Sequence, residues 1–381
     1  MSHLRRKAVF ALTVALLATT MFTPLAFAKT GVWTLISSPN QGTKDNQLLG
    51  VAPVSSSDIW AVGNYNAGPY TMSLLTLAQH WNGNSWSIVS TPNAATHTSK
   101  GDYDSLQGVA AISTKNVWAV GYSGNLNAIA DQTLIEHWNG SAWSLVSSPN
   151  PYTTQDLYAV AAVSANDIWA VGQDFSYSPY GYHTLTEHWN GTAWSEVDSP
   201  GYVALRGVTA VASNNVWAVG GSQILHWNST SWSIVPSPQP PCCGNGYELT
   251  AVAAVSANNI WAVGYKEVAS GEGYVYDPLI EHWNGSSWQL VSGGGGQTLS
   301  GVTALSATSV WAVGSIPGQS FVEQWNGTQW ARVSSPNPST TADTFQAAAA
   351  LPATGDVWAV GEEFSSTASA YQTLVEQCQA C

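Results

Sequence analysis

The tetrapeptide Trp-Ala-Val-Gly occurs seven times in this chain, and no other sequence feature constrains the fold as strongly. Two further motifs recur in step with it, one close to His-Trp-Asn-Gly and one close to Trp-x-x-Val-x-Ser-Pro. In that order, the tryptophans of the three motifs are Trp60, Trp118, Trp169, Trp217, Trp261, Trp311 and Trp358; Trp81, Trp138, Trp189, Trp227, Trp283 and Trp325; and Trp33, Trp86, Trp143, Trp194, Trp232, Trp288 and Trp330. They include all 20 tryptophans, and a period of about 50 residues predicts a fold of repeated supersecondary units.

Each repeat contains four short segments with the character of β-strands. In one repeat these are residues 106–112, the tetrapeptide at Trp118, residues 134–138 and residues 143–146. Asn139-Gly140 predicts a two-residue hairpin between the third and fourth segments, and Pro149 ends the fourth because proline has no backbone N–H to donate. Four antiparallel strands per repeat are typical of propeller blades, with the indole rings filling the wedge between neighbouring blades.

The two ends of the chain complement each other. The first strand-like segment, residues 32–39, is a lone fourth segment, whereas the chain ends after a third segment, residues 374–377. Pairing the two removes the free edges that an open sheet would leave. The sequence therefore predicts an all-β, seven-bladed β-propeller of four-stranded antiparallel blades, closed by the N-terminal strand completing the last blade.

The N-terminus reads as an export signal. Arg5, Arg6 and Lys7 precede an apolar stretch, and residues 26–28 (Ala-Phe-Ala) form a small-x-small cleavage site. We expect a signal peptide at residues 1–28, a propeller at residues 29–381, and a secreted or cell-surface monomer with no membrane insertion after cleavage. The formal charge of −13 becomes more negative once the signal is removed, which argues against nucleic acid as a partner.

The four cysteines form two close pairs, Cys242 with Cys243 and Cys378 with Cys381. Export would permit disulfides, and three connectivities are open. Zinc ligation fits less well because no histidine pattern accompanies the thiols. We expect no cofactor.

The repeat resembles kelch-type repeats and the propeller domain of galactose oxidase, because a glycine follows the second strand and a hairpin precedes a tryptophan. The order Trp-x-x-Val, apolar strand and then Trp-Ala-Val is also similar to tectonin-type lectin repeats. The kelch resemblance implies a protein-binding scaffold, and the tectonin resemblance implies recognition of surface glycans. The copper ligands of galactose oxidase have no counterparts that we can match in this chain.

Tyrosines are concentrated in one part of the expected fold. Links between second and third strands and between blades emerge on one face, and all tyrosines except Tyr158 lie in or beside these links. A phenol ring offers a stacking surface with a polar tip, which suits sugar or peptide recognition. The candidate ligand-binding residues are Tyr65, Tyr70, Tyr103, Tyr122, Phe175, Tyr177, Tyr180, Tyr182, Tyr274 and Tyr276.

Five histidines occupy one repeat position on separate blades, too far apart to share an ion, and we interpret them as scaffold: His80, His137, His188, His226 and His282. In the expected propeller, only His97 and His183 stand outside the repeat. Acidic residues also occur in the links, where they would bind calcium, catalyse or keep loops soluble: Asp102, Asp104, Asp131, Asp174, Glu272, Asp277, Glu362 and Glu363.

Three functions remain open. The first is a non-catalytic binding protein whose Tyr-rich loop face binds glycans or a protein partner. The second is an extracellular carbohydrate-active enzyme, a hydrolase or lyase, that uses acidic loop residues near the central channel. The third is a purely structural role in the cell envelope.

Overall fold

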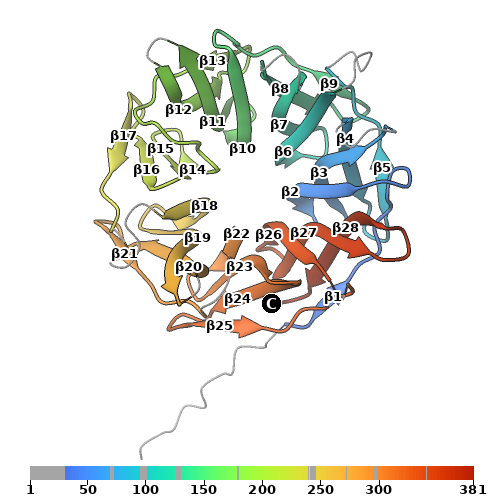
Figure 1. Cartoon of the computed structure of the whole chain (residues 1–381). Helices are drawn as coiled ribbons and strands as arrows, with labels where there is room; N and C mark the ends of the chain where they lie inside the picture. The colour runs from blue at the N-terminus through green and yellow to red at the C-terminus, as the bar shows by residue number, and fades with distance from the viewer. Residues whose placement is uncertain are drawn as a thin grey trace, which may run out of the picture.

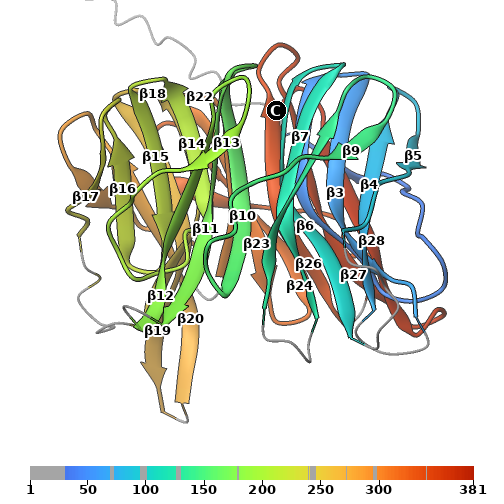
Figure 2. The same ribbon diagram turned by 90° about the horizontal axis from the view of Figure 1, so that it is seen from above.

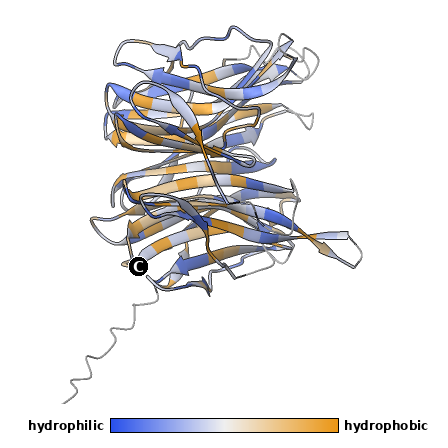
Figure 3. Ribbon diagram, turned by 90° about the vertical axis from the view of Figure 1, so that its left-hand side faces the viewer, coloured by the Kyte–Doolittle hydropathy of each residue, from blue (hydrophilic) through white to orange (hydrophobic). Residues whose placement is uncertain are grey.

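The computed structural model describes residues 31–68, 73–94, 101–125, 130–177, 180–238, 240, 246–271, 273–294, 298–339 and 341–381. Seven four-stranded antiparallel sheets surround a central axis, so the predicted propeller and its blade count are confirmed (Figure 1). Apolar residues concentrate in the strands, and the connections are mostly hydrophilic (Figure 3). No helix that could cross a membrane occurs among the described residues.

In blades 1 to 6 the strands run in chain order from the axis outward (Figure 1). Blades 1 to 3 are β2 (Asn46–Ser55), β3 (Asp58–Asn66), β4 (Leu74–Trp81) and β5 (Trp86–Val89); β6 (Asp102–Ser113), β7 (Asn116–Asn125), β8 (Gln132–Trp138) and β9 (Trp143–Leu145); and β10 (Thr154–Ser164), β11 (Asp167–Tyr177), β12 (Tyr180–Trp189) and β13 (Trp194–Glu196). Blades 4 to 6 are β14 (Gly207–Ala212), β15 (Asn215–Gly220), β16 (Gln223–Trp227) and β17 (Trp232–Val235); β18 (Tyr247–Ser256), β19 (Asn259–Ser270), β20 (Gly273–Trp283) and β21 (Trp288–Leu290); and β22 (Thr298–Ser306), β23 (Ser309–Ile316), β24 (Gln319–Trp325) and β25 (Trp330–Val333).

Blade 7 joins the two ends of the chain. It contains β26 (Asp343–Leu351), β27 (Asp356–Ser365), β28 (Ala370–Cys378) and, as its outermost strand, β1 (Trp33–Leu35). Trp33 is opposite Cys378, and the Ile36 amide donates to the Val375 carbonyl at 2.8 Å. The predicted closure is therefore confirmed.

Tryptophans from three motif positions meet at six of the seven blade interfaces. The Trp60 ring of blade 1 lies 4.9 Å from the Trp138 ring and 5.2 Å, edge-on, from the Trp143 ring of blade 2. The same triad recurs at the next four interfaces and between blades 7 and 1. Each ring buries on the order of 150–250 Å², so these triads contribute a large part of the apolar core.

The interface between blades 6 and 7 differs because cysteine replaces one indole. Trp311 packs edge-on against Trp33 at 5.7 Å, and Cys378 occupies the third position, fully buried. A disulfide joins Cys378 to Cys381, and both residues contact the apolar cluster around Trp311. This settles one pair of the cysteine connectivity, whereas Cys242 and Cys243 lie outside the described residues.

The glycine of the repeated tetrapeptide is explained by a bulge in the innermost strand. In blade 2 the pairing of β6 with β7 shifts register between Leu106 and Gly108. At Gly121 a Cβ atom would overlap the Ser105 carbonyl oxygen, and the same overlap with the adjacent strand arises at all seven copies. Only glycine fits this approach of two backbones.

The predicted two-residue hairpin between third and fourth strands is wrong in length. Trp138 is opposite Trp143, so the connection has four residues, 139–142. The Asn139 side-chain oxygen accepts from the Ser141 and Ala142 amides, and only Gly140 has a positive φ, 96°. An Asx turn therefore replaces the expected turn with positive φ at two positions.

At most blade interfaces the third strand of the blade also buries a carboxylate, or a neutral side chain at the same repeat position. Glu136, Glu187 and Glu376 are fully buried, and no described residue hydrogen-bonds to the carboxyl oxygens of Glu187 and Glu376. Burial raises the pKa of Glu187 to about 8 and that of Glu376 to about 9. Glu281 is better satisfied, because the Ser237 hydroxyl contacts both of its oxygens, and its pKa is raised to about 7.

Replacing Trp33 with alanine should open the ring. Trp33 is 3% exposed and contacts Trp311 and Phe345, so we expect Trp33→Ala to reduce the free energy of unfolding by about 3–5 kcal/mol. Chemical denaturation measures this loss. Leu35→Ala, in the same strand but 47% exposed, is the control, and an equal loss in both variants would contradict closure through the indole.

Replacing Glu376 with glutamine should stabilise the protein in alkaline solution. The folded state keeps this proton up to about pH 9, whereas an unfolded chain releases it near pH 4.5, so stability falls as the pH rises through that window. We expect Glu376→Gln to raise the free energy of unfolding at pH 8 by at least about 1 kcal/mol and to change little at pH 4. Denaturation at both pH values tests this, and Glu281→Gln, which loses the Ser237 contacts, should gain less.

Candidate functional site

The two faces of the ring carry different kinds of connection. We call the face with the links between first and second strands and between third and fourth strands the turn face, and the opposite face the loop face. The hairpin β19–β20 projects well beyond the ring on the loop face (Figure 2). Because successive strands run in opposite directions, the links in which we expected tyrosines lie on the loop face, as the sequence predicted.

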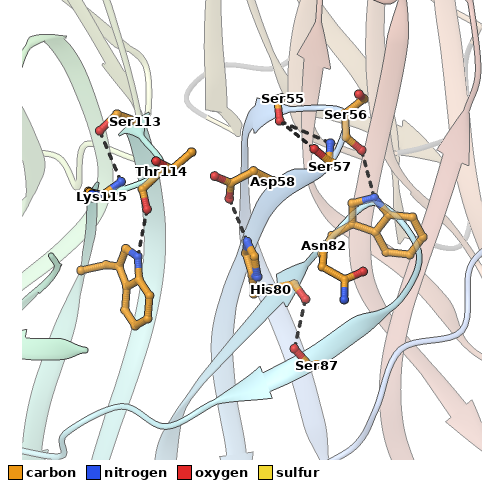
Figure 4. A network of polar contacts seen from close by, with 12 residues as sticks. Ser55, Ser56, Ser57, Asp58, His80, Asn82, Ser87, Ser113, Thr114 and Lys115 are labelled. Atoms are coloured by element: carbon orange, nitrogen blue, oxygen red, sulfur yellow. Dashed lines mark hydrogen bonds and ion pairs between the residues drawn. The ribbon is translucent and has the colours of Figure 1, made fainter. Parts of the chain in front are cut away.

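The repeated histidines belong to the scaffold on the turn-face side. His80 lies 2.8 Å from the carboxylate of Asp58, the first residue of β3 (Figure 4). Its ring also packs against Trp60, with the ring centres 4.6 Å apart. The other four repeat this arrangement with the Asp or Asn that opens their own second strand. Burial lowers the pKa of His137, which keeps the ring neutral and compatible with its packed position.

The hairpin β11–β12 ends in an exposed aromatic cluster. The Phe175 ring is at its centre, with Tyr177 at 5.2 Å, Tyr180 at 5.3 Å and Tyr182 at 5.1 Å. Tyr177 and Tyr180 are 66% and 78% exposed. The structure therefore brings these four predicted residues together, on strand extensions and not in irregular loops.

The hairpin β19–β20 carries the second pair of predicted residues. Tyr274 is 73% exposed, and Tyr276 packs edge-on against Tyr265 at 5.1 Å. These two tyrosines form one wall of a groove with a cavity volume of about 650 Å³, and the turn between β23 and β24, including Ile316 and Pro317, forms part of the other. The groove is mostly apolar and opens beside blade 6.

Tyr103 and Tyr122 lie near the mouth of the central channel, away from both hairpin tips. The Tyr103 hydroxyl donates to Asp131, and the Tyr103 ring meets Tyr122 edge-on at 6.1 Å. Tyr122 in turn meets Tyr158 at 6.3 Å. Burial raises the pKa of Tyr103 and Tyr158, so these hydroxyls remain hydrogen-bond donors at neutral pH.

Sequence reasoning missed four residues of this channel mouth. Tyr158 was the tyrosine left out, and Arg206, Glu248 and Tyr265 were not singled out. The Arg206 guanidinium carbon lies 4.1 Å from the centre of the Tyr158 ring, its Nε atom lies 3.4 Å from Glu248, and the Tyr265 hydroxyl donates to Glu248 at 2.6 Å.

A signal for Tyr158 and Arg206 was present in the repeat itself. Each of the two residues follows a buried leucine and precedes a small residue in the innermost segment of its blade. Tyr158 is located at the bulge of β10. The residues at this position line the channel: Leu49, Gln107, Tyr158, Arg206, Thr250, Ser300 and Gln346. The residue type at this position varies between repeats, whereas its two neighbours stay apolar and small. This variation indicates that the side chain at this position does not pack in the core.

The remaining predicted residues divide into packing residues and residues that the structure does not describe. Tyr65 packs against the core cluster around Trp358 and Trp86, and burial raises its pKa, so it is a packing residue. Tyr70, Glu272 and His97 lie outside the described residues.

Several of the acidic residues have structural partners. Asp102 accepts from Asn125, Asp131 accepts from Tyr103, and Asp174 lies 3.2 Å from His183. Within the described residues, no group of three or more His, Cys, Asp or Glu is arranged to hold a metal ion.

An acidic cavity lies at the loop-face end of blade 3. It has a volume of about 300 Å³, and Asp174, Glu196 and Asp198 line it with Tyr152 and Tyr202. Burial, then the Asp174 charge, raises the pKa of Glu196. Three carboxylates in one small cavity disfavour anionic ligands there.

No protein-family model and no curated protein sequence matches this chain. Solved structures do match its fold. YCF48 bound to D1 peptide aligns over 91% of this chain and 96% of its own, with 12% identity and a TM-score of 0.57. YCF48 from Cyanidioschyzon merolae aligns over 91% and 98%, with 12% identity and a TM-score of 0.55. This likeness supports the propeller class and identifies neither the kelch nor the tectonin family.

Exposed tyrosines at the hairpin tips should contribute little to stability. We expect Tyr180→Ser and Tyr274→Ser to change the free energy of unfolding by less than about 0.5 kcal/mol, because both side chains are largely in solvent. Tyr158→Ala should cost more than about 1 kcal/mol, since it removes contacts with Tyr122 and Arg206. Thermal denaturation compares the three, and a large loss at the tips would mean that they pack the fold.

Proposed function

We propose that this protein is a non-catalytic, exported binding protein that holds an extended segment of a protein partner on its loop face. The groove between hairpin β19–β20 and the β23–β24 turn is the observation that carries the proposal. Its Tyr274, Tyr276, Ile316 and Pro317 side chains offer apolar contact to a chain that lies across blades 5 and 6. A groove of about 650 Å³ fits a few side chains of a peptide.

The exposed aromatic rings support a peptide as the ligand. Tyrosine buries a large area at a small entropic cost, and its hydroxyl pairs with peptide backbone groups. Hairpin tips that contribute little to the core are free to specialise in binding.

The overall charge of −13 favours a neutral or basic segment over an acidic one. YCF48, whose fold is similar, is known in a form bound to D1 peptide, which is consistent with a peptide ligand.

Peptide display followed by titration tests this function. Displayed random peptides selected on the full chain should include binders, and Tyr274→Ala with Tyr276→Ala should weaken them about tenfold or more. Tyr202→Ala is the matched control, since Tyr202 is 74% exposed but lies at the acidic cavity.

Two results would contradict the proposal. Binding confined to oligosaccharides on a glycan array, with no selected peptide, would assign the face to glycans. Turnover of aryl glycosides that Glu196→Gln abolishes would instead favour a carbohydrate-active enzyme.

A further inference from the structure

Arg206 is an unusual residue in this chain. The sequence has only four arginines, and Arg5 and Arg6 belong to the predicted signal peptide, which leaves Arg206 and Arg332. Arg206 lines the central cavity of about 190 Å³, whereas Arg332 is in β25, the outer strand of blade 6. At the equivalent position the other six blades carry uncharged residues: Leu49, Gln107, Tyr158, Thr250, Ser300 and Gln346.

Neighbouring blades hold the Arg206 guanidinium in one orientation. Its central carbon lies over the Tyr158 ring of blade 3, 4.1 Å from the ring centre, and Glu248 of blade 5 lies 3.4 Å from Nε. Both neighbours are themselves fixed, because the Tyr158 hydroxyl donates to Asp156 at 3.0 Å and the Tyr265 hydroxyl donates to Glu248 at 2.6 Å. The side chain is therefore preorganised before any ligand arrives.

The ends of the guanidinium remain available. Among the described residues, the Arg206 side chain lies over the Tyr158 ring and pairs through Nε with the Glu248 carboxylate, and none hydrogen-bonds to its two Nη groups. The Arg206 side chain is 40% exposed at the cavity. Planar N–H groups in this arrangement match the two oxygens of a carboxylate.

We propose that Arg206 binds a carboxylate of the partner peptide at the channel mouth. The carboxylate belongs either to the peptide C-terminus or to an Asp or Glu side chain. This inference rests on the proposed function, since it places one end of the bound segment at the channel while another part occupies the groove. It makes Arg206 a residue that determines specificity, because an uncharged group in the same place would leave the two Nη groups of the guanidinium without a charged partner.

Glu248 competes with such a ligand. Its carboxylate already neutralises part of the Arg206 charge, and Asp156 stands behind Tyr158 as a second nearby acid. A ligand carboxylate must bind against these two groups, so we expect weak binding to a small probe. Removing the charge in Glu248→Gln should therefore strengthen carboxylate binding, whereas an Arg206 that only joined blades 3 and 5 would gain no ligand from that change.

Arginine-labelled protein gives a direct readout. With ¹⁵N-arginine the full chain yields at most four Nε–H signals, one for each arginine, and the Arg206 signal is the one lost in Arg206→Lys. Two probe pairs separate the sources of the carboxylate. N-acetyl-glycyl-tyrosine is compared with its C-terminal amide, and N-acetyl-aspartic acid α-amide is compared with the corresponding asparagine compound.

We expect the Arg206 Nε signal to shift with a probe acid and not with its amide, while the Arg332 signal stays unchanged. Glu248→Gln should tighten the acid at least about threefold. Equal shifts with acid and amide, equal shifts at both arginines, or no tightening in Glu248→Gln would overturn the proposal, as would shifts with glucuronic acid alone.

These outcomes are distinguishable from failure of the proposed function. The probes need no partner peptide, so they report on Arg206 even when display yields none. Conversely, peptides that depend on Tyr274 and Tyr276 but bind Arg206→Gln as tightly as the wild type would keep the peptide function and discard the carboxylate contact. Arg332→Gln is the matched control for loss of one positive charge.

Discussion

Packing of indole rings between blades is the interaction on which the rest of the structure depends. A propeller blade is a small twisted sheet that cannot bury both of its faces alone, so each blade is stable only against its neighbours. The triad formed by Trp60, Trp138 and Trp143 fills that space with large rigid side chains, and six of the seven interfaces repeat it. The seventh substitutes the buried Cys378 for an indole at the place where the chain closes on itself.

Such a scaffold separates stability from recognition. The core motifs, including the His80–Asp58 pair and its equivalents, are committed to holding the blades and turns in place. The hairpin tips at Tyr180 and Tyr274 contribute little to that core and extend into solvent. Change at the tips is therefore tolerated by the fold, which is the usual condition for a binding surface on a rigid body.

The channel mouth differs from the hairpin tips because its residues come from several blades. There the ring brings one residue from the innermost segment of every blade to the axis, so residues about 50 positions apart become neighbours. Arg206 gains Tyr158 and Glu248 from the blades on either side, and its orientation is a property of the closed ring and of no single repeat. The same closure buries carboxyl groups such as Glu376, whose raised pKa ties the stability of the ring to pH.

The repeated motifs by themselves determined the blade count, the strand order, the closure through Trp33 and the structural role of the histidines. Those features depend on the local hydrophobic pattern and on the turn residues, and both recur in every repeat. The length of the Asn139 turn, the contacts of Tyr103 and Tyr122, and the assembly around Arg206 were decided only by the tertiary structure. Ring closure brings residues from separate repeats next to one another. The distances between their side chains depend on bulges and on the spacing of the blades, which no single repeat encodes.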